Sequence, residues 1–125
     1  MAEHNDLGKW GEDVAVSFLE KKGYHVCDRD WKVGKRDLDI VVMTEDEQQL
    51  VFVEVKTRQS ADMQEPEQAV DARKIRNLAF AANAYVKSHD WSLPIRFDII
   101  TVVGKMKNVE QVEHWIDAFN PMLIL

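Results

Sequence analysis

The stretch that decides the fold reads Arg36-Asp37-Leu38-Asp39-Ile40-Val41-Val42-Met43, then Thr44-Glu45-Asp46-Glu47-Gln48-Gln49, then Leu50-Val51-Phe52-Val53-Glu54-Val55-Lys56. Two apolar runs rich in β-branched residues flank a polar, acidic segment, which predicts two antiparallel strands joined by a hairpin loop. A loop centred on residues 46–47 would set the register, because directly opposite residues share a face of the sheet. The predicted pairs are Met43 with Leu50, Val41 with Phe52, Asp39 with Glu54, and Asp37 with Lys56.

Charged side chains inside these strands predict a site. Alternation places Glu54 and Lys56 on the same face as Leu50 and Phe52, while the valines of the second run occupy the other face. Two carboxylates, from Asp39 and Glu54, then converge beside one ammonium and repel each other unless a counter-charge is present. Magnesium characteristically binds one or two carboxylates together with a phosphate, so the combination indicates phosphodiester chemistry.

A solvated strand edge is the alternative interpretation of the same charges. Glu54 and Lys56 would then face water, and Asp39 would only end its strand. The neighbouring residues are apolar on both faces, which favours a covered central strand.

Length and composition predict one globular domain over residues 1–125, with a core of about residues 7–120. The composition is 46% hydrophobic and 30% charged, as in ordinary globular proteins. The first ten residues are polar and no apolar run approaches membrane-spanning length, so we expect no membrane association and a cytoplasmic location.

Cysteine and histidine usage argues against thiol chemistry and against a histidine metal site. The single cysteine, Cys27, excludes an internal disulfide and is interpreted as a small buried thiol. The four histidines have no metal-ligand spacing and are interpreted as surface or packing residues; they are His4, His25, His89 and His114.

Net charge is −6, which argues against nucleic acid as a partner, because nonspecific phosphate affinity comes from lysine and arginine. The distribution of the cations matters more than their sum. Several gather around the predicted site and could form a basic rim on an acidic body, namely Lys35, Arg36, Lys56, Arg58, Arg73, Lys74 and Arg76. The cations at positions 73, 74 and 76 could equally be a solvated helix face.

Apolar periodicity predicts the remaining elements. A helix over residues 7–22 is capped by Gly23, a strand covers about 24–31, and a long helix opens at Pro66 and ends near His89. Two further strands are expected at 95–103 and 109–116. The order α-β-β-β-α-β-β predicts an α/β fold, with a central mixed sheet flanked by helices and the long helix in a crossover. Glu12 lies near the apolar stripe of the first helix, although a first-turn acid also favours the helix dipole.

The combination of a helix bearing Glu12, an aspartate at Asp39 and the segment Glu54-Val55-Lys56 resembles the PD-(D/E)XK superfamily of restriction-endonuclease-like nucleases. More narrowly, the chain is similar to the bacterial YraN-like family, related to archaeal Holliday-junction resolvases. The segments that carry this similarity are Gly11-Glu12, Phe52-Val53-Glu54-Val55-Lys56-Thr57-Arg58, Arg96-Phe97-Asp98 and Ala118-Phe119-Asn120. Where the family usually shows glycine and glutamate, this chain has Arg36 and Asp37, so no role for Asp37 follows.

The resemblance implies an α-β-β-β-α-β core and Mg²⁺- or Mn²⁺-dependent hydrolysis of DNA, with branched or junction DNA as the substrate of the relatives. In the roles it implies, Asp39, Glu54 and the Val55 carbonyl hold the ion, and Glu12 binds a second ion or an ordered metal water. Lys56 orients the attacking water and stabilises charge on the phosphate. The candidates for contacts to flanking phosphates are Arg58, Arg73, Lys74 and Arg76.

Two competing functions stay open at this point. One is a nucleic-acid-binding module that keeps the nuclease fold without useful turnover, as the acidic net charge would allow. The other is a protein-interaction domain, in which an exposed surface formed by Trp31, Trp91 and Trp115 joins the apolar tail at 122–125 to form a partner or homodimer surface. A symmetric homodimer would also suit a junction substrate.

Overall fold

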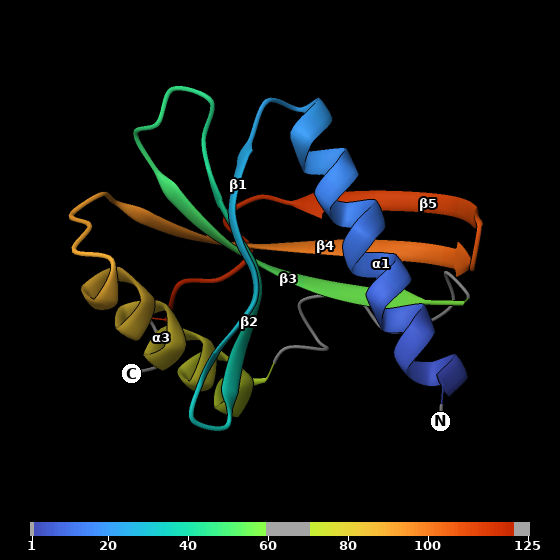
Figure 1. Ribbon diagram of the computed structural model, residues 1–125, viewed down its shortest axis with the longest axis horizontal. Coiled ribbons are helices and arrows are strands. Elements are labelled where there is room, and N and C mark those ends of the chain that lie inside the picture. Colours follow the sequence, from blue (N-terminus) through green and yellow to red (C-terminus); the bar gives the residue numbers. More distant parts are fainter. Residues whose placement is uncertain (1, 60–70, 122–125) are drawn as a thin grey trace.

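A five-stranded sheet with a helix packed on each face forms the fold (Figure 1). The computed structural model describes residues 2–59 and 71–121. Its elements are α1 (Ala2–Lys21), β1 (His25–Val33), β2 (Arg36–Met43), β3 (Leu50–Arg58), α3 (Ala72–Ser88), β4 (Ile95–Lys105) and β5 (Asn108–Trp115). The predicted element order is therefore confirmed, although α1 starts several residues before the predicted residue 7.

Strand order in the sheet follows the sequence, β1-β2-β3-β4-β5. Neighbouring strands are antiparallel except β3 and β4, which run parallel, with α3 in the connection between them. Parallel neighbours need a long crossover, and a helix is its usual form. The predicted mixed sheet is confirmed, and the architecture is compatible with a restriction-endonuclease-like core.

The helix ends are fixed by local chemistry. Gly23 has a φ of 95°, and the amides of Gly23 and Tyr24 donate to the carbonyls of Glu20 and Leu19, which closes α1 as predicted. The Asp71 side chain accepts a hydrogen bond of 2.9 Å from the Lys74 amide and caps the start of α3, which ends at His89 as expected. The predicted start at Pro66 lies outside the described residues.

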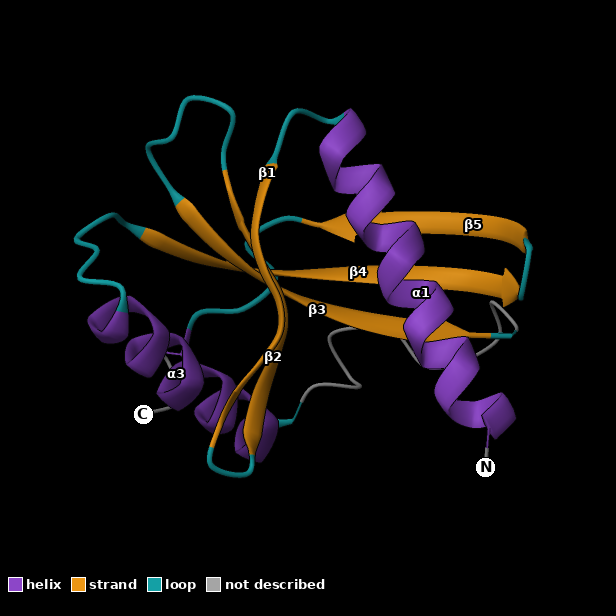
Figure 2. Ribbon diagram, in the orientation of Figure 1, coloured by secondary structure: helices purple, strands orange, loops and turns teal. Residues whose placement is uncertain are grey.

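The helices α1 and α3 cover opposite faces of the sheet (Figure 2), and alternation along the strands separates the apolar side chains into two cores. On β3, Val51 and Val53 pack with α1 on one face, whereas Leu50 and Phe52 pack with α3 on the other. The α1-side core consists of Ala15, Leu19, Ile40, Val42, Val51, Val53, Ile100 and Val102. The α3-side core consists of Leu38, Val41, Leu50, Phe52, Leu78, Ala81, Ala82, Tyr85, Phe97 and Ile99.

The predicted exposed tryptophan surface is wrong. Trp31, Trp91 and Trp115 are partly buried and pack against the α3-side core. The Trp31 ring lies edge-on to Tyr85 with centroids 5.1 Å apart, and Trp91 meets the same ring at 5.9 Å. These indoles cover an aromatic core, because a large ring gains most by burying its area. The apolar tail at 122–125 lies outside the described residues.

Over residues 2–59 and 71–121, no helix combines the length and the apolarity needed to span a bilayer.

Gly11 sets how closely α1 approaches β3. A Cβ atom at this position would overlap the Thr57 hydroxyl, whereas a Cβ at Gly8, three residues earlier on α1, meets nothing within 4 Å. We expect Gly11→Ala to lower the free energy of unfolding, because overpacking costs about 1–3 kcal/mol and outweighs the gain in helix propensity. The free energy of unfolding of each variant is measured by urea denaturation. Gly8→Ala is the control and should be neutral or stabilise by up to about 1 kcal/mol; equal effects of the two substitutions would contradict the packing argument.

Candidate active site

The site begins where β2 and β3 separate. Their backbone pairing runs from Met43 and Leu50 to Ile40 and Val53, which confirms the predicted register next to the loop. The predicted partners Asp39 with Glu54 and Asp37 with Lys56 lie beyond the last pair of this ladder. The second pairing is wrong, because Asp37 pairs with Lys32 of β1, while β3 continues alongside β4 alone as far as Arg58.

Asp39 occupies the gap that this separation opens. Its Oδ2 accepts a hydrogen bond of 2.9 Å from the backbone amide of Val55, two residues beyond the last β2–β3 pair. A buried amide that has lost its ladder partner needs another acceptor. The Asp39 carboxylate supplies it, and the bond fixes this side chain against β3, next to Glu54.

Glu54 is buried, with 5% of its surface exposed, on the sheet face that α3 covers. Lys56 Nζ lies 3.2 Å from its Oε2 and Lys74 Nζ lies 3.4 Å from the same oxygen. Lys56 comes from β3 itself, whereas Lys74 comes from the first turn of α3. The predicted convergence of two carboxylates and one ammonium is thus extended by a second ammonium, from a residue that the sequence placed in the basic rim and among the candidate phosphate contacts.

Electrostatics at the site follow from burial. Burial first, and then the charge of Glu54, raise the pKa of Asp39 to about 8, against the opposing effect of the Val55 amide. Burial also opposes the charged form of Lys74, but Glu54 and Asp39 outweigh it and raise the pKa of that ammonium. At neutral pH the metal-free site therefore favours the protonated form of Asp39, and an additional cation beside it would favour the anion.

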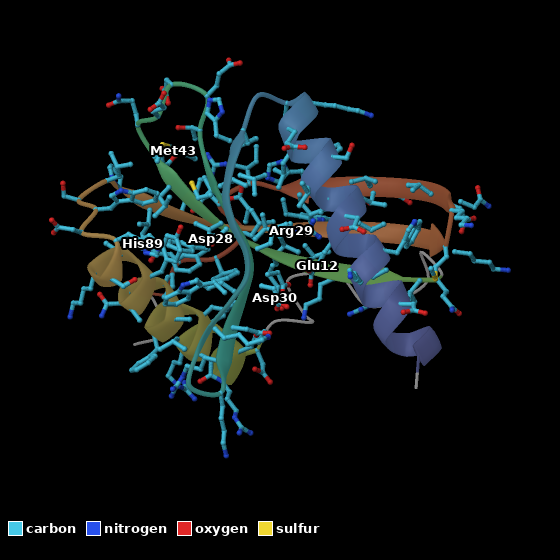
Figure 3. The ribbon with its side chains drawn as sticks, in the orientation of Figure 1. Glu12, Asp28, Arg29, Asp30, Met43 and His89 are labelled. Atoms are coloured by element: carbon cyan, nitrogen blue, oxygen red, sulfur yellow. The ribbon has the colours of Figure 1, made fainter. Side chains whose placement is uncertain are left out.

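Glu12 lies at the margin of this site. Burial and the charge of Asp30 raise its pKa, while Arg29 opposes them. Figure 3 shows Glu12 on α1 near Arg29 and Asp30 of β1. In the described part of the chain, no three acidic, histidine or cysteine side chains are arranged to hold a metal ion. Glu12 contributes to the field at Asp39, but it does not complete a three-carboxylate cluster with Asp39 and Glu54.

The other predicted phosphate contacts are spread over the surface. Arg58 donates to the Thr57 carbonyl at 3.0 Å, at the end of β3. Arg73 and Arg76 are exposed on α3, and Arg76 lines an apolar groove with Phe80 and Phe119 instead of facing Glu54. Only Lys74 of this set touches a site carboxylate in the described residues.

A second buried charge cluster was missed by sequence reasoning. Asp98 on β4 has no exposed surface, and Arg96 donates to both of its oxygens at 2.8 Å. His114 Nε2 lies 2.7 Å from Oδ2, the Asp117 amide donates to Oδ1 at 2.9 Å, and Arg96 also donates to the Tyr24 hydroxyl. Burial opposes ionisation, but His114 and Arg96 outweigh it and lower the pKa of Asp98. The signal was present in the sequence, since Arg96 and Asp98 share one face of an apolar strand.

Cys27 fits its predicted structural role. The side chain is partly buried against the α3-side core, and burial raises the pKa of the thiol. A raised pKa leaves little thiolate at neutral pH, so nothing activates this sulfur as a nucleophile.

The raised pKa of Asp39 predicts how stability of the metal-free protein changes with pH. The folded state keeps the Asp39 proton at pH values where the unfolded chain has released it, so this group lowers the free energy of unfolding as pH rises from about 4 towards 8. Asp39→Asn cannot ionise yet keeps an oxygen for the Val55 amide. We expect the variant to gain stability relative to wild type across this range, measured by urea denaturation with a chelator present. If the free energies of unfolding of wild type and Asp39→Asn change with pH in parallel, Asp39 is already ionised in the folded wild-type protein.

The chain has close relatives by sequence. Residues 11–102 match the model described as uncharacterised protein family UPF0102. The UPF0102 protein of Bacteroides thetaiotaomicron is 49% identical over 98% of this chain and 99% of that protein, and that of Flavobacterium psychrophilum is 50% identical over 95% and 98%. A solved structure, Pyrococcus furiosus SfsA in complex with Ca²⁺, aligns with a TM-score of 0.34 at 10% identity over 90% of this chain and 63% of that one. This structural likeness is too low to carry an argument.

Proposed function

The chain belongs to the uncharacterised protein family UPF0102, and we propose that it is a metal-dependent endonuclease that hydrolyses DNA phosphodiester bonds. One observation carries the proposal: the carboxylates of Asp39 and Glu54 meet with Lys56 at the point where β2 and β3 separate. A buried cluster of charged groups costs the fold stability, and active sites are where such groups gather.

The residues present fit a hard divalent cation. Carboxylate oxygens are the ligands that Mg²⁺ and Mn²⁺ prefer. Burial and the neighbouring Glu54 disfavour the charged form of Asp39 and raise its pKa, and a bound cation would oppose this effect. We assign Asp39, Glu54 and the Val55 carbonyl to the ion. When bound, such an ion supplies a water of lowered pKa and polarises the oxygens of a phosphate.

The side chains around the carboxylates have distinct roles in this proposal. Lys56, held at 3.2 Å from Glu54, orients the attacking water and stabilises charge on the scissile phosphate. Glu12, at the margin, holds an ordered water or a second ion. Arg58, Arg73 and Arg76 are candidates for flanking phosphates, because charge-assisted bonds to phosphate position a nucleic acid without reading its sequence.

Branched DNA and a symmetric homodimer belong to the same proposal. Two copies related by a two-fold axis would present two active sites to the two strands of a junction. Sedimentation with and without four-way-junction DNA would test the dimer independently of cleavage.

A second candidate function is a nucleic-acid-binding module that keeps the site but does not turn over substrate. The observation that favours it is the neutralisation of Glu54 by two ammonium groups, which leaves this carboxylate satisfied without a metal.

Cleavage of labelled DNA separates the two functions. Linear, flapped and four-way-junction substrates are incubated with Mg²⁺ or Mn²⁺ and with wild type or Asp39→Ala. We expect cleavage by wild type that depends on the added metal and is lost in the variant. Absence of cleavage of every substrate by folded wild-type protein, together with DNA binding in a gel-shift assay, would support the binding module instead.

A further inference from the structure

We propose that Lys74 is a displaceable counter-ion: it neutralises Glu54 while no divalent ion is bound, and it leaves Glu54 for a substrate phosphate once an ion binds. This inference rests on the proposed function and adds to it a residue from α3. Lys74 then sets the metal affinity of the site and couples metal binding to the contact with DNA.

The first observation is that both ammonium groups use one oxygen. Lys56 Nζ and Lys74 Nζ lie 3.2 and 3.4 Å from Glu54 Oε2. Like charges that share one acceptor repel each other, and a divalent ion placed beside them would add to this repulsion. Departure of one ammonium relieves it and frees the oxygen as a ligand.

The second observation identifies which ammonium leaves. The Lys56 side chain is 19% exposed and belongs to the strand that carries Glu54, so it is held beside the carboxylate. The Lys74 side chain is 37% exposed, and its stem can swing towards solvent without disturbing the sheet.

The third observation concerns the place of Lys74 in α3. It lies in the first helical turn, which contains no acidic residue, and its own amide is capped by Asp71. A cation near a helix N-terminus opposes the helix dipole. The charge of Lys74 therefore destabilises the start of α3, and its ion pair with Glu54 offsets this effect. A local conflict of this kind is typical of a functional position.

The test is metal affinity, measured by calorimetry with Mg²⁺ and Mn²⁺ in the absence of DNA. Lys74→Met keeps the apolar stem and removes the charge, and we expect it to bind the ion about three- to ten-fold more tightly, as loss of one nearby like charge predicts. Lys74→Arg should behave as wild type. Arg73→Gln is the matched control, since Arg73 is the exposed neighbouring cation on α3, and it should change the affinity by less than about two-fold.

A second measurement follows the departure of Lys74 from Glu54 directly. The side-chain ¹³Cε–Hε signal of Lys74, assigned by its absence in Lys74→Met, should shift and sharpen as Mg²⁺ is added, whereas the Lys56 signal keeps the properties of a bound ammonium. In cleavage assays, Lys74→Met should need about three- to ten-fold less metal but more DNA to reach half-maximal rate. If Lys74 had a purely structural role, its removal would not lower the metal concentration and raise the DNA concentration needed for the half-maximal rate.

The outcomes separate this inference from the proposed function. If wild type and Lys74→Met bind metal equally, while Glu54→Gln abolishes binding, the counter-ion role is overturned and the metal site stands. If wild type binds no metal, or binds it equally well after Glu54→Gln, both proposals fall. Thermal denaturation of each variant checks that it is folded.

Discussion

Glu54→Gln is expected to reduce metal-dependent DNA cleavage by about 10³-fold or more, because it removes one of the two carboxylates that we assign to the ion and leaves Lys56 and Lys74 beside a neutral amide. The substitution is isosteric, and Lys74 can move into solvent, so the fold should be retained. The measurement is the single-turnover rate on the best DNA substrate, with circular dichroism as the check on folding.

A matched control exists on β5. Glu110 is an exposed acidic residue in the same sheet, and Glu110→Gln changes the net charge equally. Its cleavage rate should stay within about two-fold of wild type, because an exposed charge is screened by solvent. Turnover by Glu54→Gln within ten-fold of wild type would sink the assignment of Glu54 as a metal ligand.

Asp98→Asn is expected to lower the free energy of unfolding by about 3–5 kcal/mol, because it leaves Arg96 and His114 buried without their anion. The carboxylate is fully buried, the Arg96 side chain is 15% exposed and the His114 side chain 3%. Urea denaturation at pH 7 measures the loss. Asp13→Asn is the control, since its pair with Arg29 is exposed and should be worth less than about 1 kcal/mol.

The same cluster predicts a pH dependence opposite to that of Asp39. The folded-state pKa of Asp98 is lowered, so its stabilisation is present above the unfolded-state pKa and disappears as pH falls through the folded-state value. The stability difference between wild type and Asp98→Asn should therefore shrink in acid, below about pH 4. A difference that stays constant down to acid unfolding would mean that the carboxylate contributes only through neutral hydrogen bonds.

Local sequence was sufficient for the elements and for the register next to the loop. The loop at 44–49 fixes the pairing of Met43 with Leu50 and of its neighbours, because a hairpin transmits register from its turn. The prediction failed at Asp37, where β2 leaves β3 and pairs with β1 only. Divergence of two strands depends on sheet twist and on which third strand takes over, and neither is encoded within the hairpin.

Contacts between residues far apart in the sequence could not be predicted either. Lys74 reaches Glu54 across the β3–β4 crossover, and which face of α3 it occupies depends on where that helix begins. Asp98 meets His114 and, through Arg96, Tyr24, a residue far earlier in the chain. The metal and the substrate stay predictions, because the carboxylate pair indicates a class of chemistry and the DNA is not encoded in any short motif.

Separate cores on the two faces of the sheet give the protein a spectroscopic asymmetry. Trp10 packs against the α1-side core, while Trp31, Trp91 and Trp115 pack against the α3-side core. Emission of the wild-type protein is therefore weighted towards the α3 face, and a chain that keeps Trp10 alone would report on the α1 face. Comparing the two emission signals through a denaturant titration would tell whether the two halves of the molecule melt together or one after the other.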